Sequence, residues 1–563
     1  MSDHAQPAAA STGDVLVVED LVVTTRGREP APILDGISLR VGAGETVCLV
    51  GESGSGKSVT SLATMGLLPQ GALTARSGRI LVEGEDVLTA SPARLRQLRA
   101  TRMSMIFQEP MTALNPVMTV ESQLEEVLSA HASMSTADRR TRIRDILSLV
   151  HLPDVERMCR SYPHQLSGGQ RQRVMIAMAL VLEPRLLIAD EPTTALDVTT
   201  QKQILKLIRE IQERLGTSVL FITHDMGVVA DIADRVYVMR AGEIVESGPI
   251  QAILTAPTKP YTRNLLTAVP ALRPRDARPA ASREIVLETS ELGMTYSQGS
   301  LFRKREGTVA AKDVNLILGR GRTLGIVGES GSGKSTVARC VMRLIEPTAG
   351  SIRLRGSDIS GLSRRALRPW RKRIQMIFQD PNRSLNPRLT VGDSITEGPI
   401  NYGTPPREAR EQAKTLLELV GLPKDAIDRH PHQFSGGQRQ RIAIARALAM
   451  EPDVLVADEA VSALDVSVQA QVLDLLDDIQ ARLGVALLFI THDLRVAAQI
   501  CDEVVVMQRG RVVEYGPTAE VLGNPREAYT RELIDAAPGR YWDFPNFRPL
   551  PGAAGFRDTT VPA

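Results

Sequence analysis

The same eight residues, GESGSGKS, occur twice in this chain, at residues 51–58 and 328–335. Both copies fit the pattern G-x-x-x-x-G-K-[ST]. Each follows an apolar run, TVCLVG or TLGIVG, and precedes helix-forming sequence. In that setting the loop turns successive backbone N–H groups towards phosphate oxygens, and the helix N-terminus adds a partial positive charge. A chance Gly/Ser/Lys loop is the alternative, but two identical copies behind apolar strands argue against it.

Each octapeptide is therefore predicted to be a phosphate-binding loop, or P-loop. The lysines are expected to reach the β- and γ-phosphates of a nucleotide, and the final serines to ligate Mg²⁺. The predicted nucleotide-binding residues of the two loops are Gly51, Glu52, Ser53, Gly54, Ser55, Gly56, Lys57 and Ser58, and Gly328, Glu329, Ser330, Gly331, Ser332, Gly333, Lys334 and Ser335.

The composition bounds the class of protein. A chain of 563 residues is too long for one core. Its net charge of +2 is not the concentrated basic excess of nucleic-acid-binding proteins, and an aromatic content of only 3% argues against stacking platforms for single strands. The four cysteines are scattered without a C-x-x-C pair. We therefore expect free thiols in a reducing compartment, with no zinc or iron–sulfur site.

Neither a secretory signal nor a membrane span is predicted. The first residues, MSDHAQPAAASTGD, lack a basic start and an apolar segment, so a disordered tail is expected there. The longest apolar run, VMIAMALVL at residues 174–182, is far shorter than the roughly 20 residues that a spanning helix needs. The protein is expected to be soluble or at most peripheral.

An internal repeat organises the chain. The offset between copies is 277 for the two P-loops, 271 between IFQEP and IFQDP, and 268 between LSGGQ and FSGGQ. It remains 268 for Asp190, Asp197 and His224, which pair with Asp458, Asp465 and His492. One domain thus occurs twice, with length differences only in its first half.

The predicted domain limits follow from this repeat. The first domain is placed at residues 15–272 and the second at 284–539, between a tail of residues 1–14 and a C-terminal tail of residues 540–563. The linker, residues 273–283, reads RPRDARPAASR, and its Pro, Arg and Ala content suits an exposed tether.

The pattern of each copy predicts an α/β fold. β-rich sequence comes first, then the P-loop, then a basic helical stretch and a region of amphipathic helices. Two short apolar strands complete each copy: RLLIAD with SVLFITHD, and DVLVAD with ALLFITHD. Near-continuous apolar strands that alternate with helices indicate a parallel sheet buried on both faces. The basic stretches, residues 94–102 and 364–373, are interpreted as solvated helix faces, with contact to anionic lipid as the alternative.

Polar residues stand where the apolar strands end, which is where open α/β sheets bind ligands. The aspartates suit the Mg²⁺ shell, and the glutamates that follow them are placed to orient and polarise an attacking water. The histidines are interpreted as γ-phosphate sensors and the glutamines as groups that touch both Mg²⁺ and the water. The predicted catalytic residues are Glu191, Glu459, His224, His492, Gln108 and Gln379, and the predicted metal ligands are Ser58, Gln108, Asp190, Ser335, Gln379 and Asp458.

A second glycine-containing motif occurs in each copy, LSGGQRQR and FSGGQRQR. It resembles a loop that opens a helix and presents backbone N–H groups to an anion. Because each copy already has a complete P-loop, this motif makes sense as a lid over nucleotide held by the other copy. The residues assigned to it are Ser167, Gly168, Gly169 and Gln170, and Ser435, Gly436, Gly437 and Gln438.

P-loop, Gln loop, SGGQ, Asp-Glu, A-L-D and His, in this order and twice, resemble the nucleotide-binding domains of ABC ATPases. The resemblance implies two tandem P-loop NTPase domains, each with a RecA-like core, an N-terminal antiparallel β subdomain and a helical subdomain. It also implies a head-to-tail pair of domains with two ATP molecules and Mg²⁺ between them, each P-loop facing the SGGQ motif of the other copy. Asp197 and Asp465 would then lie in loops that couple the two nucleotide sites.

Finer features resemble the peptide/nickel importer subfamily. These are FQEPMTALNP and FQDPNRSLNP, the trailing segments PTKPYTRNLLTAVP and NPREAYTRELIDAAP, and DEAVSALD. The cysteine-rich iron–sulfur segment of many members is missing here. The aromatic residue that stacks on adenine in the family is matched by Tyr296 in the second copy, whereas the equivalent place in the first copy is Thr25.

The resemblance implies the ATP-hydrolysing subunit of a bacterial importer for dipeptide, oligopeptide, glutathione, opine or nickel. Its partners would be two permease subunits and a solute-binding protein, without nucleic acid, and it would lie peripherally on the cytoplasmic face of the inner membrane. A tandem ABC ATPase that acts on ribosomes or translation is the alternative, but that branch has a long charged helical linker. A DNA-repair ABC ATPase would need zinc modules or coiled-coil insertions.

The missing aromatic residue in the first copy leads to a testable prediction. Stacking of a base on an aromatic side chain contributes about 1–3 kcal/mol. We therefore expect weaker ATP binding at the site that contains Thr25 than at the one that contains Tyr296. Nucleotide titrations that resolve two dissociation constants would test this, and equal values for the two sites would contradict it.

Overall fold

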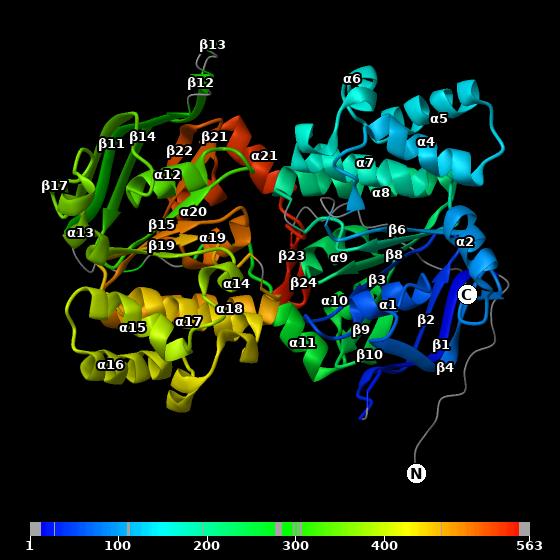
Figure 1. The fold of residues 1–563 in the computed structure, drawn as a ribbon, viewed down its shortest axis with the longest axis horizontal. Coiled ribbons are helices and arrows are strands. Elements are labelled where there is room, and N and C mark those ends of the chain that lie inside the picture. Colours follow the sequence, from blue (N-terminus) through cyan, green and yellow to red (C-terminus); the bar gives the residue numbers. More distant parts are fainter. Residues whose placement is uncertain are drawn as a thin grey trace. The chain divides into compact units, whose positions relative to one another are not determined.

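The computed structural model describes residues 13–27, 29–109, 113–194, 196–275, 278, 284–296, 299–300, 303–304, 307–462 and 464–550. The chain divides into two compact units (Figure 1). The first unit contains the described residues up to 196, residues 200–267 and those from 541 onward. The second contains residues 197–199 and the described residues of 268–540. The linker of residues 273–283 was predicted between the domains, and its described part belongs to the second unit.

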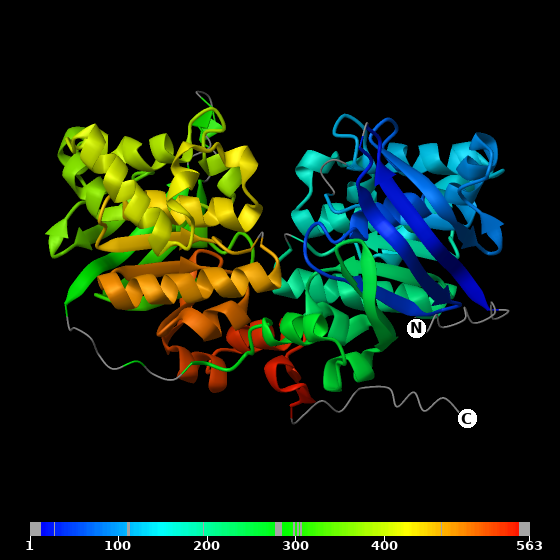
Figure 2. The ribbon, with the colours of Figure 1, turned by 90° about the horizontal axis from the view of Figure 1, so that it is seen from below.

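An antiparallel sheet forms the outer layer of the first unit (Figure 2). Its strand order is β2 (Pro32–Gly42), β1 (Asp14–Thr25), β4 (Leu73–Val82) and β5 (Glu85–Asp86). The register of β1 shifts on both edges next to Asp20, which adopts a positive φ of 45°. Such a bulge bends the strand and increases its twist. Apolar side chains of β1, β2 and β4 point to the core on one side of this sheet.

The central sheet of the first unit has the order β10-β9-β3-β8-β7-β6. All neighbouring pairs are parallel except β9 with β10. Its strands are β3 (Thr46–Val50), β6 (Met103–Ile106), β7 (Leu186–Asp190), β8 (Ser218–Thr223), β9 (Arg235–Arg240) and β10 (Glu243–Pro249). Every residue of β3, β7 and β8 is buried, as predicted for a parallel sheet covered on both faces.

Helices surround this sheet. Figure 2 shows the helices of residues 120–180 (cyan) on one side of the first unit and α10 and α11 (green) on the other. The elements are α1 (Lys57–Thr64), α2 (Pro92–Thr101), α4 (Val120–His131), α5 (Thr136–Leu149), α6 (Val155–Arg160), η1 (Pro163–Gln165), α7 (Gly168–Leu180), α8 (Val198–Leu215), α9 (Met226–Ile232), α10 (Ile250–Thr255) and α11 (Pro260–Thr267). The basic stretch of residues 94–102 falls mainly on α2, where Arg94 pairs with Glu85 and is 43% exposed.

The second unit repeats this plan. Its antiparallel sheet has the order β14-β11-β16-β17 and its central sheet the order β18-β19-β20-β15-β21-β22. The strands are β11 (Ile285–Tyr296), β14 (Thr308–Gly319), β15 (Thr323–Val327), β16 (Ala349–Leu354), β17 (Ser357–Asp358), β18 (Ile374–Ile377), β19 (Val454–Asp458), β20 (Ala486–Ile490), β21 (Glu503–Gln508) and β22 (Arg511–Pro517), with a small pair of β12 (Gly299–Ser300) and β13 (Arg303–Lys304).

Among the described residues, the helices of the second unit follow the same order as those of the first, except that α14 is described only in the second and that the 3-10 helix η2 takes the place of α6. They are α12 (Lys334–Val341), α13 (Arg364–Arg373), α14 (Pro381–Ser384), α15 (Val391–Asn401), α16 (Pro406–Leu419), η2 (Lys424–Asp428), η3 (Pro431–Gln433), α17 (Gly436–Leu448), α18 (Val466–Leu483), α19 (Leu494–Ile500), α20 (Thr518–Gly523) and α21 (Ala528–Ala536). The two units thus confirm the predicted α/β class, with an antiparallel sheet, a mostly parallel central sheet and a helical region in each.

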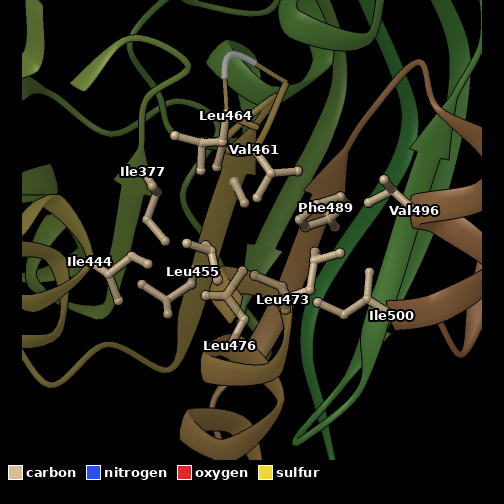
Figure 3. Packing of buried hydrophobic residues seen from close by; sticks show 14 of the residues in the cluster. Ile377, Ile444, Leu455, Val461, Leu464, Leu473, Leu476, Phe489, Val496 and Ile500 are labelled. Carbon is tan, nitrogen blue, oxygen red and sulfur yellow. The ribbon is translucent and has the colours of Figure 1, made fainter. Parts of the chain in front are cut away.

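Alternate residues of the central strands enter different cores, because successive side chains of a strand point to opposite faces. In β20, Leu487 and Phe489 pack with α17, α18 and α19, whereas Leu488 and Ile490 pack with α12 and the antiparallel sheet. Figure 3 shows Phe489 among side chains of β19, α18 and α19. The helices on the first face and the antiparallel sheet on the second therefore hold the same strand from both sides.

The described part of the linker is less exposed than a free tether. Arg275 is only 16% exposed at its side chain and forms ion pairs with Asp477 at 3.1 Å and Asp502 at 2.9 Å. Its backbone N–H also donates to the carbonyl of Ala498. Residues 268–275 therefore follow the surface of the second unit.

The last described residues form structure of their own. β23 (Trp542–Asp543), η4 (Phe544–Asn546) and β24 (Arg548–Pro549) belong to the first unit, where η4 lies against α11. Trp542 is 5% exposed and Phe544 2% exposed. Within the residues that the structure describes, no helix is both long and apolar enough to cross a membrane.

The core around Phe489 yields a stability prediction. Phe489 is completely buried, so Phe489→Ala should lower the free energy of unfolding of the second unit by about 3–5 kcal/mol. In a Trp542→Phe background the remaining tryptophan, Trp370, packs against the core of the second unit and reports its unfolding in urea.

The matched control is Phe378→Ala, which removes the same ring from a side chain that is 42% exposed. This control should change the free energy by no more than about 0.5 kcal/mol. Equal losses in the two variants would contradict the packing described for Phe489.

Candidate functional site

Each predicted P-loop lies between a central strand and a helix. The loop of residues 51–58 leaves β3 and enters α1, and the loop of residues 328–335 leaves β15 and enters α12. Gly51 and Gly328 have φ values of 155° and 148°, and a Cβ there would lie 2.1 Å from the carbonyl oxygen of Met239 or 2.2 Å from that of Met507. Only glycine fits such close backbone approach. The loops therefore have the strand–loop–helix setting predicted from the sequence.

The P-loop lysines are buried inside their own loops. Lys57 Nζ donates to the carbonyls of Gly51 and Glu52, both at 2.8 Å. Lys334 Nζ makes the same pair of bonds in the second unit, both at 2.7 Å. Burial lowers the pKa of Lys334. A desolvated ammonium group gains strongly from an anion brought beside it, so these lysines suit phosphate.

A hydroxyl and a carboxylate meet beside each P-loop. Ser58 Oγ donates to Asp190 at 3.2 Å, and Ser335 Oγ donates to Asp458 at 3.1 Å. Burial raises the pKa of both aspartates. These oxygens are the hard ligands that Mg²⁺ prefers, and a cation would relieve the cost of a buried carboxylate. The residues present therefore fit Mg²⁺ next to bound phosphates.

The predicted glutamate, histidine and glutamine also come together in each unit. In the first unit, Gln108 Nε2 donates to Glu191 Oε2 at 3.0 Å, and His224 Nδ1 lies 3.2 Å from Glu191 Oε1. In the second unit, the corresponding distances from Gln379 and His492 to Glu459 are 2.9 Å and 3.4 Å. Each glutamate thus has one oxygen beside the amide and the other beside the imidazole.

The glutamate and the histidine favour each other's charged form. Burial acts to raise the pKa of Glu459, but the hydrogen bond and charge of His492 outweigh it, so that this pKa lies below its usual value. Burial acts to lower the pKa of His492, and the hydrogen bond and charge of Glu459 raise it above the usual value. Glu191 shows the same balance with His224. An ionised glutamate is the form that can accept a proton from water.

Both glutamates adopt a backbone conformation that non-glycine residues rarely adopt. The φ angles are 47° at Glu191 and 48° at Glu459. Their N–H groups donate to the carbonyls of Ile222 at 2.9 Å and Ile490 at 3.0 Å, on the neighbouring strands. Such strain persists only where the surroundings enforce it, and it is concentrated at functional sites. The strained turn directs each carboxylate to the place where the strands end.

Two supporting residues were missed from the sequence. Ser61 Oγ donates to Asp190 at 3.2 Å, and Thr194 Oγ1 donates to Glu191 at 2.9 Å. The second unit has Ala338 in place of Ser61, and Ser462 there donates to the backbone carbonyl of Glu459 instead. Because neither contact recurs in the second unit, the repeat gave no signal for them.

The SGGQ motifs open helices, as predicted. Ser167 is the N-cap of α7 and forms a reciprocal capping box with Gln170, and Ser435 does the same with Gln438 at α17. These hydrogen bonds lie within each motif's own helix. The predicted closure of each motif over nucleotide held by the other copy stays a prediction.

The remaining predicted residues lie at element ends. Asp465 is the N-cap of α18, and Asp197 directly precedes α8 and accepts a hydrogen bond from Thr199 at 2.9 Å.

Thr25 and Tyr296 are the last residues of β1 and β11. These strands have equal lengths and a positive-φ residue at the same place, Asp20 or Glu291. The two positions are therefore equivalent, and Tyr296 is 39% exposed.

Comparison with known proteins shows to which family the chain with this site belongs. The family model described as "ABC transporter" matches residues 34–194 and 311–462, which include both P-loops and both Asp-Glu pairs. The chain belongs to the ABC transporter family. As a tandem ABC protein with two ATP-binding cassettes, it is an ATPase, and the first and second units each contain one cassette.

A second model, "Oligopeptide/dipeptide transporter, C-terminal region", matches residues 245–305 and 513–552. The chain is 46% identical over 532 residues to the peptidoglycan transport ATP-binding protein YejF of Agrobacterium fabrum, covering 94% of this chain and 97% of that protein. It is 45% identical over 559 residues to the glutathione import ATP-binding protein GsiA of Shigella boydii, covering 93% and 90%. These matches confirm the predicted resemblance to ATP-binding proteins of peptide transporters and give no support to the ribosome alternative.

Among solved structures, the chain is similar to cbiO1 from Clostridium perfringens, part of the ABC transporter complex cbiONQ. The identity is 31%, the TM-score is 0.39, and the match covers 45% of this chain and 94% of that one.

The geometry of the two glutamates predicts the effect of removing their charge. Glu191→Gln together with Glu459→Gln should lower the rate of ATP hydrolysis by about 10²- to 10⁴-fold, because an amide cannot take a proton from water. ATP should remain bound, since the P-loop lysines are unchanged. Single-turnover hydrolysis and equilibrium binding of ATP measure the two effects separately.

A matched control is Glu210→Gln. Glu210 also lies beside a histidine, at 2.8 Å from His151 Nε2, but on the exposed surface of α8. Its activity should equal that of the unmodified protein, and full turnover in the double variant would refute the role of the two glutamates.

Proposed function

We propose that this ABC ATPase drives a bacterial importer for peptides or related small solutes, such as a dipeptide, an oligopeptide, glutathione, an opine or nickel. The observation that supports this most directly is the transporter C-terminal region, which recurs after both cassettes. The relatives named for glutathione import and peptidoglycan transport align with more than nine-tenths of this chain and support the same class of solute.

The proposed role of each residue within a cassette follows from the contacts of its side chain. Lys57 would leave its two loop carbonyls to hold the β- and γ-phosphates, and Ser58 with Asp190 would hold Mg²⁺. Bound Mg²⁺ neutralises charge on the phosphate oxygens. Glu191 would accept the proton of the attacking water, while Gln108 and His224 fix the orientation of its carboxylate.

The second cassette contains the same set, with Lys334, Ser335, Asp458, Glu459 and His492 in the same roles. Because each cassette retains the lysine, the glutamate and the histidine, we propose that both hydrolyse ATP. The domain limits of residues 15–272 and 284–539, and the pairing of each P-loop with the SGGQ motif of the other cassette, belong to this proposal.

The proposed partners are two permease subunits and a solute-binding protein, with the ATPase held peripherally at the cytoplasmic face of the inner membrane. Hydrolysis would be converted into transport by helices of the permeases that dock near Gln108 and Gln379. Selection of the solute would lie with the binding protein, since the proposed roles of the ATPase residues above concern only nucleotide and metal.

This proposal predicts what the tagged, full-length chain should bring with it from detergent-solubilised membranes of its own host. We expect two polytopic permease proteins, and an ATPase rate that rises several-fold when a solute-loaded binding protein is added to the reconstituted complex. Uptake of labelled dipeptide, glutathione and Ni²⁺ into vesicles would then identify the solute.

The control for this experiment is the complex with Glu191→Gln and Glu459→Gln, which should assemble but not transport. Recovery of the chain with ribosomes and without permeases would refute the proposal.

A further inference from the structure

A tyrosine of the trailing helix contacts the P-loop backbone in both cassettes. The N–H of Glu52 donates to Tyr261 Oη of α11 at 3.3 Å, and the N–H of Glu329 donates to Tyr529 Oη of α21 at 3.2 Å. We infer that Tyr261 and Tyr529 are positioning residues that hold each P-loop lysine in place through the loop backbone. Both tyrosines lie in the segments that match the transporter C-terminal region.

The tyrosine and the lysine act on the same peptide group. The N–H of Glu52 and the carbonyl of Gly51 belong to one planar peptide unit. That carbonyl accepts from Lys57 Nζ at 2.8 Å. Hydrogen bonds in such a chain polarise one another, so a donor bond to tyrosine strengthens the carbonyl as an acceptor for lysine. In the second unit, Lys334 Nζ bonds the carbonyl of Gly328 at 2.7 Å.

The orientation of this peptide unit has to be fixed by a contact from outside the loop. It begins at a glycine with a φ of 155° in the first unit and 148° in the second. Glycine permits rotation that other residues resist, so the loop backbone alone does not fix the direction of the carbonyl. A tyrosine hydroxyl on a neighbouring helix restrains the other end of the same plane.

The helix that presents the tyrosine is itself fixed to the central sheet. Glu246 of β10 accepts from the N–H groups of Thr258 at 2.7 Å and Lys259 at 3.3 Å, just before α11. Glu514 of β22 accepts from Arg526 and Glu527 at 2.8 Å and 3.3 Å, just before α21. The sheet therefore sets the position of each hydroxyl relative to the P-loop that leaves it.

The two tyrosines are held by different surroundings. The guanidinium of Arg240 lies 4.9 Å from the ring centroid of Tyr261, a cation–π contact. In the second unit the residue equivalent to Arg240 is Gln508, which carries no charge. Tyr529 is held by burial instead, since it is only 8% exposed. That the hydroxyl reaches the same N–H in both units despite this difference supports a role for the hydroxyl itself.

The test removes only the two hydroxyls, by Tyr261→Phe with Tyr529→Phe in the full-length chain. The inference rests on ATP use at the two P-loops and not on the proposed peptide import, so ATP hydrolysis by the chain without permeases tests it separately. We expect the KM for ATP to rise about three- to tenfold, which is the factor expected when the hydrogen bond to the loop backbone is lost at each site. The kcat should change by less than about twofold, because the lysine is misplaced before phosphate binds.

The matched control is Tyr237→Phe. Tyr237 Oη accepts the N–H of Arg40 at 3.2 Å, so the control removes the same kind of bond, between a tyrosine hydroxyl and a backbone N–H, from β2 instead of a P-loop. Its KM should equal that of the unmodified protein, while thermal unfolding checks that both variants are folded. A double variant whose KM equals that of the control, or whose kcat falls at unchanged KM, would overturn the inference. Equilibrium binding of ATP to the single variants provides the same comparison if the double variant does not fold.

Discussion

A parallel strand that is buried on both faces can place polar groups only where it ends. In each cassette, β3, β7 and β8 or their counterparts consist of buried residues, apart from the partly buried Asp458 at the end of β19, so charge gathers at the edge where these strands stop. The P-loop and the histidine come within two residues of the end of one of those strands, and the aspartate of the Asp-Glu pair is the last residue of another. The cores on the two faces of the sheet, one made by helices and the other by the antiparallel sheet, hold the strand ends in register. The nucleotide site is thus a consequence of how the sheet is covered.

Much of this site could be predicted from the sequence, because its residues follow recognisable strands and recur at fixed offsets. The lysines, the aspartates, the glutamates and the histidines were all identified in this way. Ser61 and Thr194 were not, since each makes its contact in one cassette only. Tyr261 and Tyr529 recur, but their partner is a backbone N–H about 200 residues away, which no side-chain pattern encodes. The linker composition likewise did not reveal that Arg275 would pair with Asp477 and Asp502.

The two cassettes share one chemical plan and differ in how its parts are supported. The direct contacts among glutamate, histidine, glutamine, serine and aspartate differ by no more than 0.2 Å between them. Their neighbours differ more: Thr25 of the first cassette corresponds to Tyr296 of the second, Ser61 corresponds to Ala338, and Arg240 corresponds to Gln508. The second cassette therefore retains these direct contacts, while the residues next to them differ.

The segment of residues 541–549 has a consequence for how the chain is made. Although it is the last part to be synthesised among the described residues, it belongs to the first unit, where Trp542 and Phe544 are buried and η4 lies against α11. A nascent chain leaves the ribosome with its N-terminal cassette lacking that cover throughout the synthesis of the second cassette. The first-made cassette is thus complete only after residues 541–549 have been synthesised, and a product that ended before them would lack part of the cover of its N-terminal cassette.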